Sequence, residues 1–142
     1  MPGSHQEQQR VLLVDDEEKD VLLTRLALER AGLELPVYSV PGGQEAIAYL
    51  NGDPPYQDRF RYPLPALVLL DIQMPRMDGF EVLRWVRKQP NFATLPVVML
   101  TGSRTKAVAQ TARLLGATSL FVKSVNLANG ADLLGCIQRL IR

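Results

Sequence analysis

Short, almost uninterrupted apolar segments recur along the chain, and helical patterns of apolar residues lie between them. Strands that are buried on both faces of a parallel sheet have this continuous apolar character. Helices are indicated where apolar residues recur every three to four positions. The predicted strands are Val11–Val14, Val37–Val40, Leu67–Leu70, Val97–Leu100 and Leu120–Val122, and the predicted helices are Asp20–Ala31, Gln44–Leu50, Gly79–Lys88, Thr105–Leu115 and Asn126–Ile141.

This alternation predicts an α/β fold, a doubly wound five-stranded parallel sheet in a flavodoxin-like, three-layer α/β/α architecture. Five strands are too few for a (β/α)8 barrel, so an open sheet remains. We expect the strand order 2-1-3-4-5, which places the first and third strands side by side. In such sheets the ligand crevice lies beyond the carboxyl ends of the strands.

Two segments lie outside the repeating pattern. Residues 1–9 form a polar leader in which Gly3-Ser4-His5 resembles a tag remnant, so we assign the fold to one domain over residues 10–142. The segment Asn51–Pro65 has four prolines, two tyrosines and no periodicity, and it is long for a connection in a compact domain. A packed surface loop is the favoured interpretation, and a partner-binding loop is the alternative.

Composition and charge exclude several classes of function. With 142 residues, the chain can bury a core without disulfide or metal support. Its 16 basic and 15 acidic residues leave a net charge of +1, which argues against direct nucleic-acid binding. A single cysteine, Cys136, and a single histidine, His5, exclude an internal disulfide and a Cys/His metal cluster. No apolar segment reaches membrane-spanning length and no signal peptide is visible, so we expect a cytoplasmic protein without membrane contact.

Polar residues that suit one chemistry follow four of the predicted strands. Asp15 and Asp16 come directly after the first strand, and Asp71 follows the third. Thr101 and Lys123 follow the fourth and fifth strands. Because parallel strands present their carboxyl ends at one edge of the sheet, we expect the three carboxylates to converge there, flanked by the threonine and the lysine.

Three carboxylates in one crevice repel one another, and a bound cation would relieve that repulsion. Mg²⁺ suits such a site because it takes one or two carboxylates and completes its coordination with waters and phosphate oxygens. A lysine and a hydroxyl beside it can stabilise a phosphoryl group, and a carboxylate can act as a nucleophile that forms an aspartyl phosphate. The structural alternative is that Asp15 or Asp16 simply caps the following helix.

At these residues the chain resembles the receiver domains of two-component response regulators, over residues 10–142. The segment around Asp71 is highly specific, because Met-Pro follows three residues later and Met-Asp-Gly comes next. The resemblance implies a single-domain response regulator that signals through changed protein–protein interactions. The matching motifs are VLLVDDEE at Val11–Glu18, LVLLDIQMPRMDGFEVL at Leu67–Leu83, VVMLTGS at Val97–Ser103 and FVKS at Phe121–Ser124.

The resemblance also implies roles for the acidic residues. Asp71 would accept a phosphoryl group from a phosphohistidine on a sensor histidine kinase or a histidine phosphotransfer protein, and would lose it by self-dephosphorylation. Asp71 and Asp16 would bind Mg²⁺ directly, Asp15 would bind it through water, and Gln73 would supply its backbone carbonyl. Mn²⁺ would be able to replace Mg²⁺.

Lys123 and Thr101 would respond to the phosphoryl group in such a domain. Lys123 would pair first with Asp71 and then with the phosphoryl oxygens. Thr101 would swing towards the phosphoryl group and so move the loop after the fourth strand. Gly102 would help that loop, since glycine adopts backbone angles that are closed to other residues, or it would merely ease a tight turn.

The sequence departs from the family pattern at two positions. Ser124 follows Lys123, where family members usually have proline in a cis peptide, so we expect a trans peptide and a different loop shape. Leu120 stands where a switch aromatic is usual. Phe121 lies one residue later, and successive strand residues face opposite sides, so Phe121 cannot simply replace that aromatic. Output would then rely on the loop after Thr101 and on helix shifts, or Leu120 would belong to a permanent interface.

A narrower similarity points to the stand-alone receivers that are paired with bacterial phytochromes and other sensor kinases. A phytochrome-like kinase is therefore an expected partner. The residues that carry this similarity are Tyr49, Leu50, Gly52, Tyr56, Asp58, Arg59, Pro63, Leu64 and Pro65, the helix start Gly79–Leu83, and Trp85 and Arg87.

We also expect a homodimer through the fourth helix, the fifth strand and the last helix. The alternative is that the apolar side chains of the last helix face the sheet, because a closing helix must bury one stripe. The candidate contacts are Leu120, Ala131, Leu134, Cys136 and Ile137.

Two other classes of function fit the fold less well. A phosphatase that works through an aspartyl phosphate generally needs an acidic residue two positions after the nucleophile, and Gln73 stands there. A flavin or nucleotide binder would need a phosphate-binding loop rich in Gly, Ser or Thr after the first strand. The acidic segment Asp15–Glu18 would instead repel phosphate unless a metal ion bridged the two.

Overall fold

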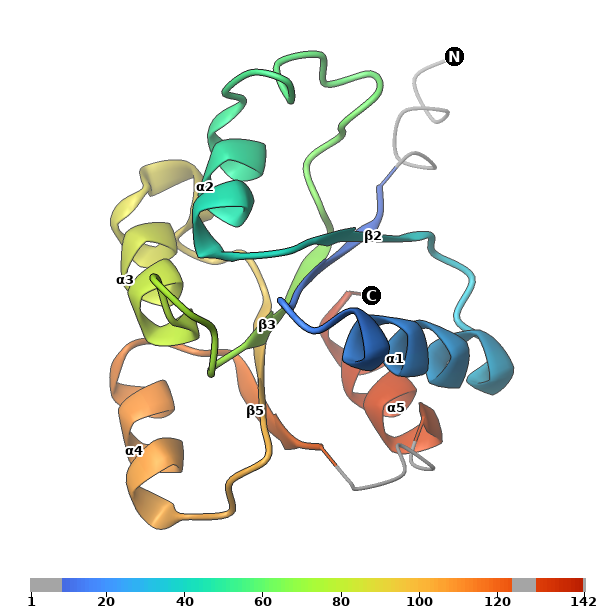
Figure 1. Ribbon diagram of the computed structural model, residues 1–142, viewed down its shortest axis with the longest axis vertical. Coiled ribbons are helices and arrows are strands. Elements are labelled where there is room, and N and C mark those ends of the chain that lie inside the picture. Colours follow the sequence, from blue (N-terminus) through green and yellow to red (C-terminus); the bar gives the residue numbers. More distant parts are fainter. Residues whose placement is uncertain (1–8, 124–129, 142) are drawn as a thin grey trace.

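The computed structural model describes residues 9–123 and 130–141 (Figure 1). Its centre is a parallel sheet in the order β2-β1-β3-β4-β5, which confirms the predicted doubly wound topology. The strand bounds differ from the predicted ones by one residue at most. The strands are β1 (Val11–Val14), β2 (Val37–Val40), β3 (Leu67–Asp71), β4 (Val97–Thr101) and β5 (Ser119–Val122).

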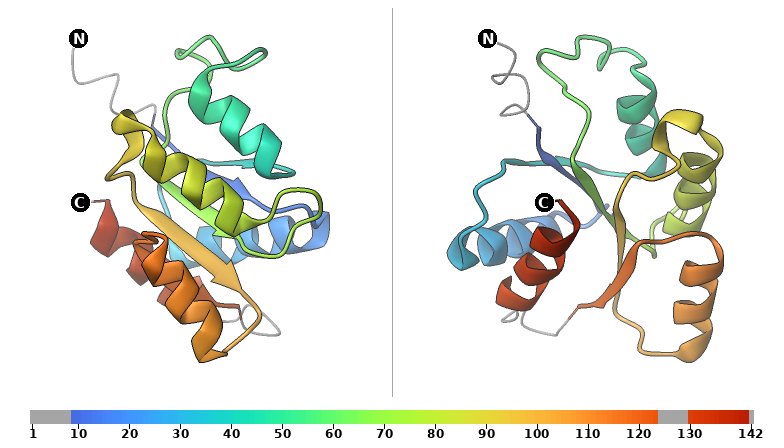
Figure 2. Two further views of the ribbon diagram at one scale, coloured as in Figure 1. Left: turned by 90° about the vertical axis from the view of Figure 1, so that its left-hand side faces the viewer. Right: turned by 180° about the vertical axis from the view of Figure 1, so that it is seen from behind.

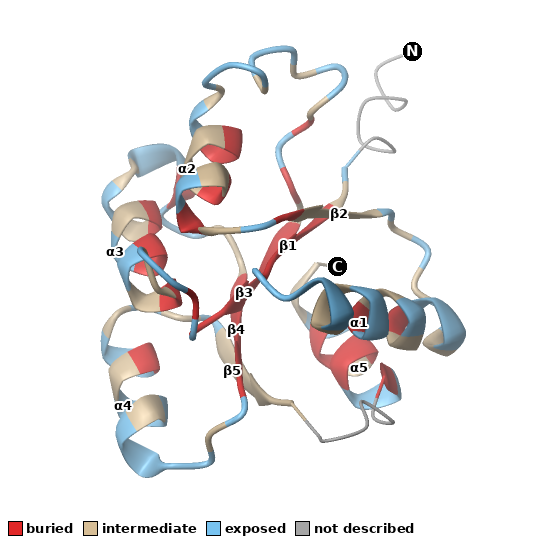
Figure 3. Cartoon of the chain, in the orientation of Figure 1, coloured by how far each residue is buried: buried red, intermediate tan, exposed pale blue. Residues whose placement is uncertain are grey.

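The strands are in close register, so that their carboxyl ends form one edge. Val14 of β1 is paired with Leu70 of β3, and Thr101 of β4 is paired with Val122 of β5. The three central strands β1, β3 and β4 are buried throughout their length, as their continuous apolar sequences predict (Figure 3). The polar residues that follow these strands therefore meet at the carboxyl edge.

Five helices cover the sheet and make the predicted three layers. One face carries α1 and α5, and the other carries α2, α3 and α4 (Figures 1 and 2). A Cβ built on Gly130 would overlap the backbone of Ala27, so glycine allows α5 to pack closely against α1. The helices are α1 (Glu18–Ala31), α2 (Gly43–Asn51), α3 (Gly79–Lys88), α4 (Lys106–Leu114) and α5 (Gly130–Leu140), and a short 3-10 turn, η2, spans Pro90–Phe92.

Helix ends follow their local sequence signals. Asp78 and Glu81 form a capping box at the start of α3, where the Asp78 carboxylate accepts from the Glu81 N–H and the Glu81 carboxylate accepts from the Asp78 N–H. Gly32 ends α1 with φ of 105°, the left-handed angle that is typical of a glycine C-cap. The last helix is predicted from Asn126, but residues 124–129, which include Ser124, lie outside the described part of the chain.

The long connection before β3 packs as a surface loop, which confirms the favoured interpretation. Arg59 donates hydrogen bonds to the carbonyl oxygens of Tyr49 and Leu50 at the end of α2, and to that of Tyr62 in the loop itself. The buried Tyr49 hydroxyl donates to the Pro63 carbonyl at 2.7 Å. The Tyr49 and Tyr56 rings lie 5.1 Å apart, so the loop packs its aromatic side chain against the core next to α2.

The last helix corrects the set of residues predicted for a dimer contact. Leu134, Cys136 and Ile137 are buried against the sheet on the α1–α5 face, and only Ala131 of the predicted contacts on α5 is exposed. The amphipathic stripe of α5 thus closes the core, which is the alternative that the sequence left open. None of the described helices is both long enough and apolar enough to cross a membrane.

Candidate functional site

Three carboxylates converge at the carboxyl edge of the sheet, as predicted. Asp15 and Asp16 follow β1, and Asp71 is the last residue of β3. One carboxylate oxygen from each residue lies within 4.8 Å of the others. Asp15 and Asp71 are only 2% and 6% exposed, whereas Asp16 is exposed. The cluster therefore has a buried floor and one ligand at its rim.

Backbone hydrogen bonds fix the floor of this pocket. The Asp15 N–H donates to the Val40 carbonyl at 3.2 Å, and its Oδ1 accepts from the Glu17 N–H at 3.0 Å. Glu17 is the N-cap of α1 and makes no side-chain cap hydrogen bond. The alternative in which Asp15 or Asp16 is the helix cap is therefore wrong. Asp15 is instead held with its carboxylate in the pocket.

Glycine also shapes the pocket at the far end of the loop after Asp71. The Gly79 N–H donates to the Ile72 carbonyl at 2.9 Å, which closes this loop. A Cβ on Gly79 would overlap the carbonyl oxygen of Asp71. Gly79 belongs to the motif that follows Asp71, but the sequence alone did not predict this close approach. Its position directly after the helix cap Asp78 was the available signal.

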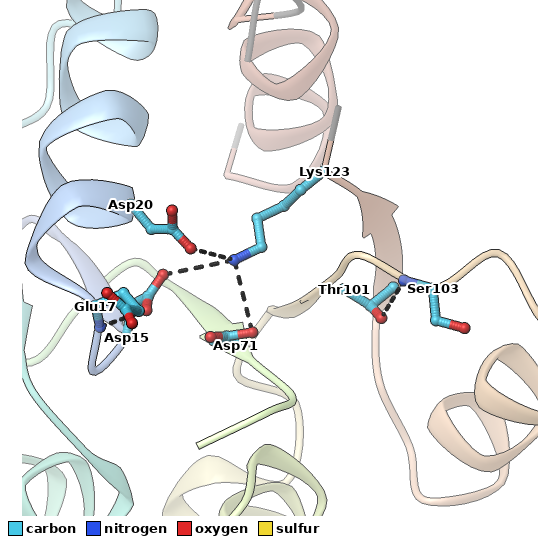
Figure 4. Close-up of polar contacts among 7 residues, drawn as sticks. All are labelled: Asp15, Glu17, Asp20, Asp71, Thr101, Ser103 and Lys123. Atoms are coloured by element: carbon cyan, nitrogen blue, oxygen red, sulfur yellow. Dashed lines mark hydrogen bonds and ion pairs between the residues drawn. The ribbon is translucent and has the colours of Figure 1, made fainter. Parts of the chain in front are cut away.

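Lys123 reaches the carboxylates from the end of β5 (Figure 4). Its Nζ lies 3.7 Å from Asp15 Oδ2, 3.7 Å from Asp71 Oδ1 and 3.2 Å from Asp20 Oδ2. The backbone N–H of Lys123 donates to the Thr101 carbonyl at 2.7 Å, which anchors Lys123 beside β4. Asp20 was not among the predicted site residues. Its place in the first turn of α1, just after the acidic pair, was the only sequence signal.

Burial and charge repulsion shift the protonation equilibria of the pocket. Burial is the largest cause that raises the pKa of Asp71 to about 7; Lys123 counteracts it and Asp15 adds to it. Burial likewise raises the pKa of Asp15, although the Glu17 N–H opposes this rise. Burial alone would lower the pKa of Lys123, but Asp71 and Asp15 outweigh it and the pKa is raised. Burial thus disfavours the charged forms of Asp71 and Asp15, and one ammonium group does not fully offset this effect.

The donor set of the cluster fits a hard divalent cation. Its ligand atoms are carboxylate oxygens, which Mg²⁺ and Mn²⁺ prefer, and it contains no thiolate or imidazole. Asp15 Oδ2 is buried without a hydrogen-bond donor, so it has a lone pair to offer to a water or a cation. Gln73 is exposed on the loop after β3, and its backbone hydrogen bond to Asp71 lowers the pKa of that carboxyl.

Thr101 lies at the same edge of the sheet as the carboxylates, and its hydroxyl is hydrogen-bonded to the following loop. It is 2% exposed at the end of β4, and its Oγ1 accepts from the Ser103 N–H at 3.0 Å (Figure 4). Gly102 is exposed, has no left-handed backbone angle and would meet nothing within 4 Å if it carried a Cβ. Gly102 therefore adopts no left-handed backbone angle in this conformation, and its part in a movement of the loop stays a prediction.

The predicted alternation on β5 is confirmed. Leu120 packs with the residues under α2, α3 and α4, whereas Phe121 packs with those under α1 and α5. Phe121 therefore does not occupy the position of a switch aromatic. Leu120 is half-buried and supplies apolar contact on the α4 side of the sheet without an aromatic ring.

Comparisons with known proteins give one consistent result. Residues 11–134 match the response regulator receiver domain family. The response regulator Rcp1 of Synechocystis is 33% identical over 93 residues, which are 66% of this chain and 61% of Rcp1. The matched segment thus spans about three fifths of that relative.

Solved structures agree with this result. The Mn²⁺-bound form of Rcp1 has a TM-score of 0.78 at 28% identity and covers 92% of this chain and 91% of its own. The phosphorylated cyanobacterial phytochrome response regulator RcpA has a TM-score of 0.81 at 29% identity, with 94% and 93% coverage. The bacteriophytochrome response regulator AtBRR has a TM-score of 0.79 at 38% identity, with 93% and 91% coverage.

Proposed function

The chain belongs to the response regulator receiver domain family, and on that premise we propose that Asp71 is its phosphoacceptor. The observation that carries the proposal is the position of Asp71, buried at the carboxyl end of β3 within 4.8 Å of two further carboxylate ligands and 3.7 Å from the Lys123 ammonium. The donor is a phosphohistidine on a sensor histidine kinase or a histidine phosphotransfer protein. The phosphorylated state of RcpA supports the same chemistry at the equivalent fold.

The transfer breaks one bond and forms one bond. A carboxylate oxygen of Asp71 attacks phosphorus, the P–N bond to the donor imidazole breaks, and the imidazole leaves with the electron pair. Lys123 stabilises the charge on the phosphoryl oxygens. Water later hydrolyses the acyl phosphate. The domain thus promotes its own phosphorylation and dephosphorylation and acts on no separate substrate.

Asp16, Asp71 and the Gln73 carbonyl, with Asp15 acting through water, are the groups we propose to hold Mg²⁺, or Mn²⁺ in its place. The ion supplies positive charge to the carboxylates and to the phosphoryl oxygens. The Mn²⁺-bound form of Rcp1 supports a divalent ion at this fold. In this chain, the raised pKa of Asp71 means that a metal ion would compete with a proton for its carboxylate. Ionisation would free one carboxylate oxygen for the metal ion and the other for attack on phosphorus.

Thr101 is the group that we propose senses the phosphoryl group. Its hydroxyl now accepts from Ser103, and donation to a phosphoryl oxygen would pull on the loop that leads into α4. Because β5 has Leu120 in place of a switch aromatic, the response is carried by this loop and by movement of α4. Signalling then follows from altered protein–protein contacts, with residues 10–142 as the receiver domain and residues 1–9 outside it.

A phytochrome-like sensor kinase is the proposed partner, since RcpA and AtBRR are phytochrome-associated regulators with the same fold. A homodimer through α4, β5 and α5 is a second proposed contact, carried by the 84% exposed Leu114 and by the half-buried Leu120. The near-neutral charge leaves direct nucleic-acid binding out of this proposal. The free, buried Cys136 fits a reducing cytoplasm.

Labelling with acetyl phosphate tests the phosphoacceptor directly. Wild-type protein should be labelled on Asp71 only when Mg²⁺ or Mn²⁺ is present, and Asp71→Asn should remove the label. Mass spectrometry of the trapped acyl phosphate locates the modified residue. Labelling of Asp71→Asn at the same level would show that another residue is the acceptor.

A further inference from the structure

The Lys123 ammonium is closest to a carboxylate that does not belong to the acidic cluster. Its distance to Asp20 Oδ2 is 3.2 Å, and Lys123 donates a hydrogen bond there. The distances to Asp15 and Asp71 are both 3.7 Å, which is beyond hydrogen-bond length. Figure 4 shows the lysine between α1 and the pocket floor, with Asp20 on the α1 side.

Asp20 differs from the other two partners in exposure and in role. Its side chain is 39% exposed, compared with 0% for Asp15 and 9% for Asp71. It is absent from the group of carboxylates whose oxygens converge within 4.8 Å. A cation held by that group would therefore weaken the attraction of Asp15 and Asp71 for the Lys123 ammonium. The attraction between Asp20 and Lys123 would be little affected.

We propose that Asp20 is a positioning residue that tethers Lys123 to α1 and thereby weakens the contact between Lys123 and a phosphoryl group on Asp71. This inference rests on the proposed role of Asp71 as phosphoacceptor. An ammonium has three donors, so Asp20 and a phosphoryl oxygen can be bound together, but its positive charge is then divided between them. Without Asp20, the remaining partners of Lys123 are the two carboxylates of the pocket floor, so we expect the ammonium to move towards the floor, where Asp71 lies.

Beryllofluoride, which mimics the phosphoryl group on a carboxylate, measures this contact at equilibrium. In saturating Mg²⁺, Asp20→Ala should bind beryllofluoride about 2–5-fold more tightly than wild type, the size expected for a partly exposed ion pair. Glu18→Ala is the matched control, because Glu18 is an exposed residue of the same turn that forms no ion pair with Lys123. Glu18→Ala removes the same charge, so any gain in beryllofluoride affinity that it shows measures the general electrostatic effect of losing one carboxylate. Asp20→Glu should return the affinity towards that of wild type.

A second background separates a positioning role from a structural one. In Lys123→Ala protein, Asp20→Ala and Glu18→Ala should have equal effects, because no ammonium remains to be tethered. Equal gains from Asp20→Ala and Glu18→Ala in the presence of Lys123, or weaker binding by Asp20→Ala, would overturn the inference. A persistent difference between them in the Lys123→Ala background would overturn it too. Failure of the wild-type protein itself to bind beryllofluoride in Mg²⁺ would instead contradict Asp71 as the acceptor.

Discussion

Replacing the buried carboxyl of Asp71 with an amide should make the metal-free protein more stable at neutral pH. Asp71 has a pKa of about 7 in the fold against its ordinary value of 3.8, mainly because burial disfavours its charge. Between these values the unfolded chain releases a proton that the folded protein retains. Stability contributed by the neutral carboxyl is therefore complete below pH 3.8 and is lost as the pH rises towards 7.

The size of the effect follows from the same difference. Each pH unit corresponds to about 1.4 kcal/mol, so the ionisation of Asp71 costs the fold at most about 4 kcal/mol. Asp71→Asn removes this cost and keeps the size of the side chain. At pH 8 without divalent ions, we expect the variant to be more stable than wild type by about 2–4 kcal/mol. At pH 4 the two proteins should be almost equally stable. Mg²⁺ should narrow the gap at pH 8, because it binds the ionised wild-type site.

Urea denaturation followed by Trp85 fluorescence measures this gap. Trp85 lies on α3 and packs against Phe92 at 6.3 Å between ring centroids, so it reports loss of the core without lying in the pocket. Asp132→Asn, which changes an exposed carboxylate on α5, is the control and should show no comparable pH-dependent gain. Equal stabilities of wild type and Asp71→Asn at pH 8, or a gap that widens towards pH 4, would refute the reasoning.

Three further predictions concern the other pocket residues. Asp16→Ala should weaken Mg²⁺ binding by about 10-fold or more, because it removes a carboxylate that we propose as a direct ligand. The stability of the metal-free protein should stay equal or rise, because carboxylate repulsion falls; calorimetric titration and thermal melting measure the two effects. Thr101→Ala should leave Asp71 open to phosphorylation but abolish the amide chemical-shift response around Leu120 and α4 when beryllofluoride is added, and an unchanged response would rule out Thr101 as the relay. Gly79→Ala should lower the free energy of unfolding by about 2 kcal/mol or more, because the Cβ of the alanine would overlap the Asp71 carbonyl. An unfolding free energy equal to that of wild type, measured by urea denaturation, would contradict this close approach.

Local patterns predicted the strands and the helices, whereas the strand order also depended on the resemblance to receiver domains. Continuous apolar segments predicted all five strands within one residue of their bounds. Because parallel strands end at one edge, the acidic residues that follow β1 and β3 could be placed together before any distance was known. The capping box at Asp78 and the left-handed Gly32 are likewise signals carried within one or two turns of the chain.

The contacts that refine the site join segments far apart in the chain. Lys123 and Asp20 are separated by 103 positions, and their side chains come to 3.2 Å because α1 begins, and β5 ends, at the same edge of the sheet. Elsewhere in the fold, Arg87 on α3 donates to the carbonyl oxygen of Gly116, 29 positions further along the chain, and no local pattern predicts that contact. Such pairings depend on how the helices pack on the sheet, so sequence spacing alone did not identify them.

The last helix shows the same division between sequence and tertiary structure. Its periodicity established that one stripe is apolar, and both a dimer surface and the sheet can bury such a stripe. Only the packed structure shows Leu134 and Ile137 against the sheet. A sequence thus determines which side chains must leave water, because their hydrophobicity is a property of each residue. The tertiary structure decides which surface buries these side chains, because that choice depends on the contacts available once all elements have packed together.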